Sequence, residues 1–426
     1  MIKRKLSKDE KLLIKGISEL NKRRDTLQQL AVNEIAKNKF QIINFFTSAG
    51  KTYLVKNCIL RMQKYFLNDN PYVVVVNSDV LKEEFEKVLD GIPNVECYIV
   101  NTFVKDRITF GEVNAVFFDE AHHYLNEDSL EFKKTIPKID CSYKVLLSAT
   151  LEKEQLNYAE SLGFNHNFLV DTDEALFMNL IPDYIIYNLG LELEGFYKTQ
   201  YENIDKTFKD YVAYFKAVIP ERTEFVVANL IKPENKLLLE EVTGLLNEFY
   251  DMEYSVGQVM GMVMKYYKSI SNRKKFLDSC KIKIDVCKKL IAKAENLDLQ
   301  TVVFTGNKLV GKSLLTKNAE VYFSESNLKV IDNFAKRITK TVISCNKLVE
   351  GQISNGIEFV LRTNYNNKKR YFKQAKGRGL RFSEKVKYLI VVNVYLKNTQ
   401  EETWLKNQTK NEKFINYISS MEEVQF

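Results

Sequence analysis

The strongest constraint on the fold of this chain is a repeated alternation of short apolar strands with helical segments. Five near-continuous apolar runs, rich in β-branched and aromatic residues, stand at 41–46, 72–76, 97–100, 113–118 and 144–147. Five more, again separated by helical spacing, stand at 301–305, 320–323, 341–345, 357–361 and 387–394. Strands that are apolar on both sides belong to parallel sheets covered by helices on both faces. The sequence therefore predicts an α/β fold with two tandem parallel-sheet domains.

The two alternations also divide the chain. We expect a basic extension at 1–23 that forms an exposed helix, a first domain at 24–180 and a second domain at 273–426. Between them, 181–272 is predicted to be a linker, strand-like at 183–193, with a mostly helical insert. The helical part, 196–272, could supply contacts to a polyanionic partner or serve only as a packing element, and the sequence leaves both interpretations open. Ligands of open parallel sheets bind beyond the carboxyl ends of the strands, so polar clusters that directly follow strands are the candidate sites.

Composition excludes several classes of protein. The 426 residues contain no apolar run of about 18 residues, so a membrane-spanning helix is not expected. The first 24 residues are charged and lack the apolar core of a signal peptide, so we expect a cytoplasmic location. Six scattered cysteines without a CxxC pair indicate the thiols of a reducing compartment rather than a zinc site. The net charge of +8 fits a polyanionic partner.

A small-residue turn follows the first strand and leads into helical spacing. The turn consists of Thr47, Ser48, Ala49, Gly50, Lys51 and Thr52. Backbone N–H groups at a helix N-terminus attract phosphate oxygens, and the helix dipole adds to the attraction. A lysine at this place reaches the β- and γ-phosphates of a nucleotide, and the hydroxyl after it is a Mg²⁺ ligand. The full pattern has Gly six positions before the lysine, where this chain has Phe45.

A second stretch competes for the role of phosphate loop. Gly306 to Ser313 matches the pattern GxxxxGK[ST] without a mismatch and also follows a strand. No apolar strand ending in two carboxylates comes after it, whereas such a strand follows the loop at Lys51. We therefore assign the nucleotide to the Lys51 loop and keep the Lys312 loop as the alternative.

Two adjacent carboxylates end the strand at 113–118. Asp119 is placed to hold Mg²⁺, and Glu120 is placed to orient or deprotonate an attacking water molecule. The motif continues to His122, one of only three histidines in the chain. Ser148 and Thr150 follow the next strand, where small hydroxyl residues can link a nucleotide site to a moving second domain. These clusters make the carboxyl edge of the first sheet the candidate site of nucleotide hydrolysis.

A cluster of cations and glycines stands late in the second alternation. It contains Gln374, Arg378 and Arg381, and the two arginines share one face of a helix because they are three positions apart. Arginine is suited to bidentate phosphate contact, and an arginine finger is worth roughly 10³ to 10⁵ in rate in other phosphoryl-transfer enzymes. Taken alone, the stretch could equally be a solvated basic surface.

The order of the four motifs resembles that of the superfamily-two helicases and translocases, whose core is two RecA-like domains. The order is Gly-Lys-Thr, then Asp-Glu-Ala-His of the DEAH type, then Ser-Ala-Thr, then Gln-x-x-Gly-Arg-x-x-Arg, and it covers residues 24 to about 393. The tract at 273–304, the stretch at 332–334 and the ending at 377–381 are similar to the UvsW/XPB/RecG-like DNA branch. The turn at 47–52 is similar to that of phage recombination helicases.

The resemblance implies roles for further residues. Gln28 matches the adenine-reading glutamine of the family, and Gly351, within 346–352, matches the family's motif V beside the nucleotide. Gln374, Arg378 and Arg381 match its motif VI. The family contacts nucleic-acid phosphates at the positions that match Asn77, Ser78, Thr102, Asn307 and Lys308.

The implied function is an ATP- and Mg²⁺-dependent DNA helicase or translocase that acts on forked or branched DNA in replication, recombination or repair, including branch migration. An RNA helicase, or a double-stranded DNA translocase that does not separate strands, stays open because the ATP motifs do not read the sugar. We expect a monomer that contacts mainly phosphates, so its binding should weaken steeply with salt.

Overall fold

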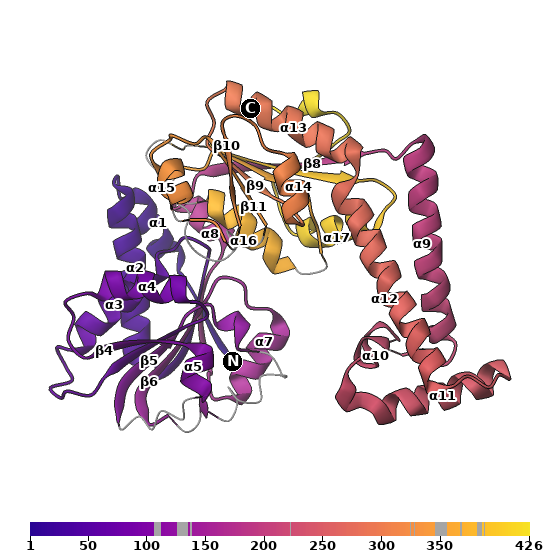
Figure 1. Cartoon of the computed structure of the whole chain (residues 1–426). Coiled ribbons are helices and arrows are strands. Elements are labelled where there is room, and N and C mark those ends of the chain that lie inside the picture. Colours follow the sequence, from indigo (N-terminus) through magenta and orange to yellow (C-terminus); the bar gives the residue numbers. More distant parts are fainter. Residues whose placement is uncertain are drawn as a thin grey trace.

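Two seven-stranded sheets form the body of the computed structural model, and every described strand pair is parallel (Figure 1). The structure describes residues 1–105, 112–125, 135–136, 139–221, 223–323, 325–327, 329–345, 356–366, 369–380, 386 and 388–426. In spatial order the first sheet consists of β1 (Ile2–Lys5), β7 (His166–Val170), β2 (Phe40–Phe45), β6 (Cys141–Ser148), β5 (Val113–Phe118), β3 (Tyr72–Val76) and β4 (Val95–Ile99). The second consists of β10 (Ala319–Tyr322), β11 (Thr341–Ser344), β9 (Thr301–Phe304), β12 (Phe359–Arg362), β13 (Tyr388–Leu396), β8 (Asp183–Leu191) and β14 (Ile415–Ile418).

The predicted fold class of two tandem RecA-like α/β domains is confirmed. The helical segment, expected between the domains, is inserted into the second one, because β8 of the second sheet precedes it. All ten strands predicted from apolar runs are present, with ends that shift by a few residues. Every residue of β3 and β5 is buried, because helices cover both faces of the sheet.

Helices alternate with the strands in both domains. Those of the first domain are α1 (Lys8–Gly16), α2 (Leu20–Lys37), α3 (Lys51–Met62), α4 (Asp79–Leu89), α5 (Val100–Lys105), α7 (Lys153–Ser161) and α8 (Thr172–Phe177), with a 3₁₀ turn at Ala121–His123. Those of the second domain are α13 (Lys281–Asn296), α14 (Lys308–Ser313), α15 (Lys329–Ala335), α16 (Lys369–Gly379) and α17 (Gln400–Thr409).

The N-terminal residues differ from the expected exposed basic helix. Residues 2–5 form β1, an edge strand of the first sheet that pairs with β7, and a separate helix, α1, follows. Arg4 of this strand lies over the Phe168 ring at 4.7 Å and pairs with Glu10 at 2.6 Å. Charged side chains are compatible with a strand at the edge of a sheet, which is why the local charge pattern concealed it.

The stretch at 183–193, expected within the linker, contributes a strand to the second sheet. β8 lies between β13 and β14 and pairs with β13 over nine residues. This sheet therefore receives one strand from before the helical segment and the other strands from after it.

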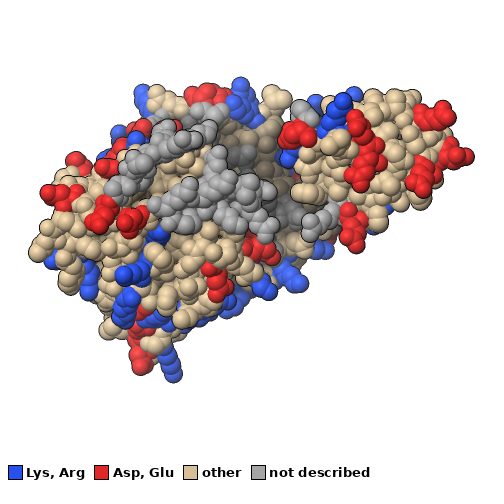
Figure 2. All heavy atoms as spheres, turned by 90° about the horizontal axis from the view of Figure 1, so that it is seen from below, with Lys and Arg blue, Asp and Glu red and all other residues tan. Residues whose placement is uncertain are grey.

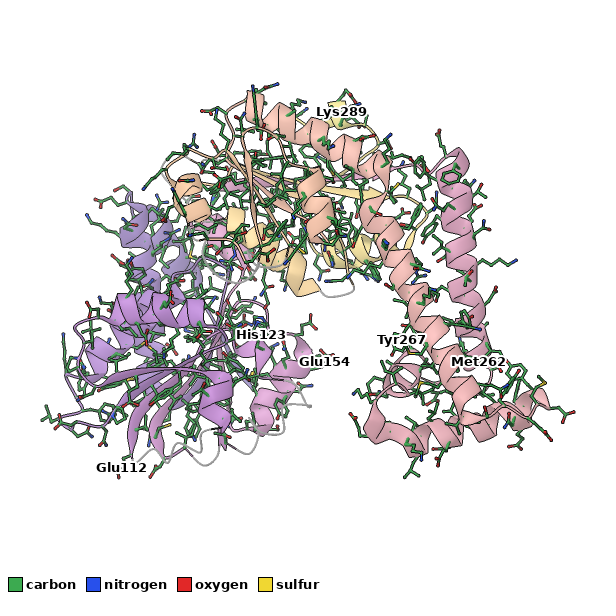
Figure 3. All side chains as sticks on the ribbon, in the orientation of Figure 1. Glu112, His123, Glu154, Met262, Tyr267 and Lys289 are labelled. Atoms are coloured by element: carbon green, nitrogen blue, oxygen red, sulfur yellow. The ribbon has the colours of Figure 1, made fainter. Side chains whose placement is uncertain are left out.

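The helical segment forms a unit that, in Figure 1, extends downward from the second domain and to the right of the first domain. It consists of α9 (Gly195–Lys216), α10 (Thr223–Asn229), α11 (Lys236–Tyr250) and α12 (Val256–Ser279). The unit has an apolar core of its own around Phe215 and Leu246, and Met262 and Tyr267 of α12 pack against this core (Figure 3). We call these four helices the helical unit.

The two sheet domains are packed against each other. One continuous cluster of buried apolar side chains includes Ile43 of the first sheet, Met178 and Ile181 of the connection, and Val302 and Val360 of the second sheet. Among the described residues, no helix is both long enough and apolar enough to span a bilayer.

Candidate active site

The turn after β2 has the geometry of a phosphate loop. Lys51 is the first residue of α3, and Gly50 precedes it in the left-handed conformation with φ 75°. Ser48 is also left-handed, with φ 78°, and such turns gather backbone N–H groups into an anion-binding concavity. Phe45 is the last residue of β2 and packs edge-on against Phe168 at 5.1 Å. The departure from the loop pattern at Phe45 therefore belongs to the strand and not to the turn.

The competing stretch at 306–313 has a different geometry. Asn307 caps α14, and its side chain accepts a hydrogen bond from the Val310 N–H at 2.9 Å. Gly311 lies inside the helix, where its N–H donates to the Asn307 carbonyl at 3.1 Å. A Cβ at Gly311 would lie 2.8 Å from the Phe323 ring. Gly-Lys-Ser thus ends a helix instead of beginning one, and the Gly311 N–H is not available to a phosphate.

Asp119 and Glu120 follow β5 at the carboxyl edge of the first sheet. The Asp119 side chain is buried, and its Oδ1 has no hydrogen-bond partner among the described residues. Glu120 has a φ of 46°, a left-handed conformation that is uncommon for a residue with a Cβ and recurs at functional sites. Its Oε1 lies 3.9 Å from Lys51 Nζ. The acidic pair and the phosphate loop therefore share one site.

The two carboxyls have opposite electrostatic surroundings. Burial and the adjacent Glu120 charge raise the pKa of Asp119 above its usual range. Burial also acts on Glu120, but Lys51, His122 and Arg378 outweigh it and lower the pKa of that carboxyl. Glu120 is therefore the more readily ionised member of the pair and carries a negative charge at neutral pH.

His122 connects the acidic pair to the other domain. Its Nδ1 lies 3.3 Å from Glu120 Oε2 and 3.2 Å from Ser148 Oγ, and its Nε2 lies 3.5 Å from the Gln374 side-chain amide. Gln155 donates to the His122 carbonyl at 2.7 Å, which holds the backbone of this turn. With the proton on Nδ1, the ring can donate toward Glu120 or Ser148 while Nε2 accepts from Gln374. The predicted coupling residues His122 and Ser148 thus lie in direct contact.

Helix α16 brings the second domain to the site. Ser48 Oγ donates to the Gly377 carbonyl of α16 at 3.1 Å. A Cβ at Gly377 would lie 2.5 Å from Thr47, so only glycine allows this approach. Arg378 and Gln374 of the same helix are buried beside the phosphate loop. Arg381 and Gly351, with the rest of 346–352, lie outside the described residues.

One cavity of about 560 Å³ contains most of the predicted site. Its lining includes these predicted residues from both domains: Gln28, Thr47, Ser48, Gly50, Lys51, Thr52, Asp119, Glu120, Thr150, Gln374 and Arg378. Ala49 is buried beside this wall and does not line it, whereas Ala149 does. The sequence interpretation missed Arg24, Tyr53 and Asn57, which also line the cavity. Tyr53 had a local signal, since it directly follows Gly-Lys-Thr.

Gln28 supports the phosphate loop in this structure. Its side-chain amide donates to the Gly50 carbonyl at 3.2 Å, and its oxygen accepts from Asn57 at 2.9 Å. A Cβ at Gly50 would lie 2.7 Å from Gln28 Nε2. Gln28, the predicted adenine-reading residue, therefore contacts the backbone of the phosphate loop directly.

The donor set at the acidic pair fits a Mg²⁺ ion that takes its remaining ligands from phosphate and water. Asp119 Oδ1 is a buried acceptor without a described hydrogen-bond partner, and Thr52 lines the same cavity. Within the described ranges, no three His, Cys, Asp or Glu side chains converge as a metal cluster. Mg²⁺ at phosphates commonly uses only one or two protein oxygens, so these residues suffice.

The predicted nucleic-acid residues lie outside this cavity, after strands β3, β4 and β9. Ser78 and Asn307 are helix N-caps, and their side chains accept from backbone N–H groups at 3.4 and 2.9 Å. Thr102 is exposed on α5, and Asn77 directly follows β3. Lys308 pairs with Glu325 at 2.6 Å.

The comparisons with known proteins add a likeness in fold. No family model and no curated protein matches this chain. Among solved structures, the chain is similar to the crystal structure of Pyrococcus furiosus Hef helicase domain, with 13% sequence identity and a TM-score of 0.49. The similarity covers 89% of this chain and 96% of that chain.

Proposed function

We propose that the chain is an ATP-hydrolysing helicase or translocase of the superfamily-two type that acts on DNA. The observation that carries this proposal is the composition of one cavity. Lys51, Asp119 and Glu120 enter it from the first domain, and Gln374 and Arg378 enter it from the second. A site built from two domains can open and close with the state of its nucleotide, which is the requirement for a motor.

In this mechanism the first domain binds the triphosphate. The N–H groups at the start of α3 and the Lys51 ammonium neutralise the β- and γ-phosphates, and Gln28 contacts the adenine while it supports the loop. Thr52 and Asp119 would hold Mg²⁺, which when bound neutralises further phosphate charge. The N–H dipoles are already oriented in the turn, so little reorganisation is needed at the moment of reaction.

Glu120 acts as the base for the attacking water. Its lowered pKa keeps it ionised and able to accept a hydrogen bond from that water, and its Oε1 lies 3.9 Å from Lys51 Nζ. His122 orients this carboxylate and relays its state to Ser148 and Gln374. The pair that hydrolyses ATP is thereby coupled to the second domain.

Arg378 supplies the charge that completes the site from α16, and Arg381 is proposed to join it. While the γ-phosphate is present, these cations hold the two domains together over it. After hydrolysis that contact is lost and the domains can separate. Repeated closure and opening then moves the chain along the nucleic acid, with Gly351 proposed to couple the nucleotide to that movement.

DNA is proposed to run along the carboxyl ends of strands β3, β4 and β9, where Asn77, Thr102 and Asn307 lie. The helix N-termini capped by Ser78 and Asn307 present N–H groups suited to phosphate oxygens. Forked or branched DNA is the proposed substrate. Stronger stimulation of ATP hydrolysis by RNA than by a DNA fork would indicate an RNA helicase. Displacement of a triplex strand without unwinding of a duplex would indicate a translocase that leaves strands paired.

The first test compares the two candidate phosphate loops. We expect Lys51→Ala to reduce DNA-stimulated ATP hydrolysis by roughly 100-fold or more, because a preorganised charge contact to the reacting phosphate is removed. Lys312→Ala, at the end of α14, is the matched control and should retain the rate of the unchanged chain. The assignment is wrong if the Lys312 change abolishes turnover and the Lys51 change does not.

A further inference from the structure

The charge of the helical unit is divided along its length. Its base, residues 195–216 and 265–279, carries nine Lys and Arg against four Asp and Glu. Its tip, residues 217–264, carries three Lys and Arg against eight Asp and Glu, although the chain as a whole has a net charge of +8. The acidic side chains of the tip are all exposed, namely Glu221, Glu224, Glu234, Glu240, Glu241, Glu248, Asp251 and Glu253. Figure 2 shows acidic side chains gathered on the lobe that this unit forms.

Helix α11 presents one face of this tip to solvent. Its buried face, formed by Leu239, Val242, Thr243 and Leu246, packs into the core of the helical unit. Its exposed face, which we call the outer face of α11, consists of Lys236, Leu237, Glu240, Glu241, Gly244, Leu245, Glu248 and Phe249. The one ion pair described on this face joins Lys236 to Glu240 at 3.8 Å, so Glu241 and Glu248 keep their charge directed outward.

The outer face of α11 is also apolar. Leu237 is 81% exposed, Phe249 58% and Leu245 40%. Among the described residues, 23 large apolar side chains are exposed, and seven of them lie in the tip, which is only 48 of the 426 residues. An exposed apolar patch rimmed by charges marks a surface that associates with a partner.

Gly244 leaves open space on this face. It lies in the middle of α11, where glycine is less favourable than alanine by about 1 kcal/mol. A Cβ at this position would meet nothing within 4 Å, so no packing inside the described chain requires a glycine there. The gap that it leaves on the outer face admits the backbone or a bulky side chain of a second molecule.

We propose that the outer face of α11 docks a basic amphipathic helix of a partner protein. Leu237, Leu245 and Phe249 would pack against apolar side chains of that helix. Glu241 and Glu248 are seven residues, or about 10 Å, apart along α11, so they match two Lys or Arg residues seven positions apart in the partner. This inference does not depend on the proposed ATPase activity.

Charge argues against the other occupants. Nucleic acid is a polyanion, so the acidic tip would repel it. The base of the helical unit, with its excess of Lys and Arg, would attract it instead. A symmetric dimer through this face would place Glu241 and Glu248 of one copy against the same acidic face of the other. A contact between the acidic tip of one copy and the basic part of another would pair opposite charges, and it closes into a ring or extends into a filament according to its rotation, so light scattering tests it.

The test uses the full chain and a fluorescent helical peptide of about 20 residues, with a Leu stripe and Lys pairs seven positions apart. A peptide with Glu in place of Lys is the probe control. We expect binding of the Lys peptide that weakens with salt and that falls at least about tenfold in Glu241→Lys/Glu248→Lys. Leu237→Ser/Phe249→Ser should lose binding too, and helical content measured by circular dichroism should stay unchanged in both variants.

The matched variant is Glu83→Lys/Glu86→Lys, which reverses two exposed glutamates of α4 in the first domain, at the opposite end of the molecule (Figure 1). It should bind the Lys peptide as the unchanged chain does, and all variants should keep basal ATP hydrolysis. Three results overturn the proposal: equal binding of the Glu peptide, undiminished binding by the α11 variants, or light scattering that shows a dimer which these variants dissociate.

Discussion

At the scale of single residues, the site depends on glycines that allow two surfaces to approach. Gly50 is left-handed and lies against Gln28, which holds the turn by its side-chain amide. A side chain at Gly50 would therefore act in two ways. It would strain the backbone, and it would push Gln28 away from the loop carbonyl that it binds.

We expect Gly50→Ala to lower the free energy of unfolding by about 1–2 kcal/mol, because a left-handed residue acquires a Cβ. It should also weaken the binding of a non-hydrolysable ATP analogue, because displaced Gln28 no longer supports the loop. Urea denaturation and fluorescent-analogue titration measure the two effects.

Gly91→Ala is the matched control for this prediction. Gly91 is left-handed as well, with φ 77°, but a Cβ there would meet nothing within 4 Å. It should show the loss of stability without the loss of nucleotide affinity. Equal affinity of both variants for the analogue would contradict the role given to Gln28.

At the scale of elements, a buried ion pair joins α13 to α17 behind the second sheet. Lys283 and Glu401 lie 2.6 Å apart, and their side chains are 1% and 2% exposed. The Leu396 N–H also donates to Glu401 at 3.1 Å. Burial raises the pKa of Glu401 to about 7, although Lys283 opposes that shift. The pair therefore links the two helices, although burying the two charged groups removes their hydration.

We expect Lys283→Met to destabilise the fold by about 3–5 kcal/mol at pH 8, because Glu401 is left buried without its cation. A carboxyl whose pKa is raised by folding stabilises the folded state below its ordinary value of 4.5. That stability is lost as the pH rises through the folded-state value. The variant should thus be affected less at pH 5 than at pH 8, as measured by urea denaturation.

The double variant Lys283→Met/Glu401→Gln removes the titrating group and keeps an acceptor for the Leu396 N–H. Its free energy of unfolding should therefore vary less between pH 5 and pH 8 than that of Lys283→Met. A single variant whose loss of stability is equal at both values would show that Glu401 does not titrate in this range.

At the scale of the whole molecule, the site exists only where the two domains meet. Ser48 and Thr47 of the first domain contact α16 of the second at Gly377, and Gln374 reaches His122. The approach of α16 thus decides whether Arg378 stands at the phosphate loop.

We expect Gly377→Ala to lower kcat for ATP by about tenfold or more, since a Cβ 2.5 Å from Thr47 forces α16 away. The affinity for the ATP analogue should change little, because the phosphate loop belongs to the first domain. Steady-state kinetics and analogue titration separate the two quantities.

Gly261→Ala, in the open middle of α12, is the control for a glycine removed from a helix. A Cβ there meets nothing within 4 Å, so kcat should be unchanged and stability should rise by about 1 kcal/mol. Unaltered kcat in Gly377→Ala would mean that closure of α16 on Thr47 is not needed for turnover.

Sequence patterns predicted ten strands from their apolar runs, including the edge strands β4 and β10, and they did not predict β1, β7 and β14. A central strand such as β3 is recognisable in the sequence as a continuous apolar run, because helices cover both of its faces. Edge strands such as β1 and β14 keep charged or polar residues, so they look like loops or helix. Local periodicity also could not show that β8 pairs with β13, some 200 residues later in the chain.

The sequence by itself determined the two parallel-sheet domains and the residue types at their carboxyl edges, because burial and turn chemistry are local properties. Tertiary structure distinguishes the geometry of the two Gly-Lys loops. Gly50 stands before its helix and Gly311 stands inside one, a difference set by where each helix begins. It also decided that Gln374 and Arg378 line the same cavity as Lys51. These residues are more than 300 positions apart and meet only because the two domains pack together. A local sequence pattern carries no information about such a contact.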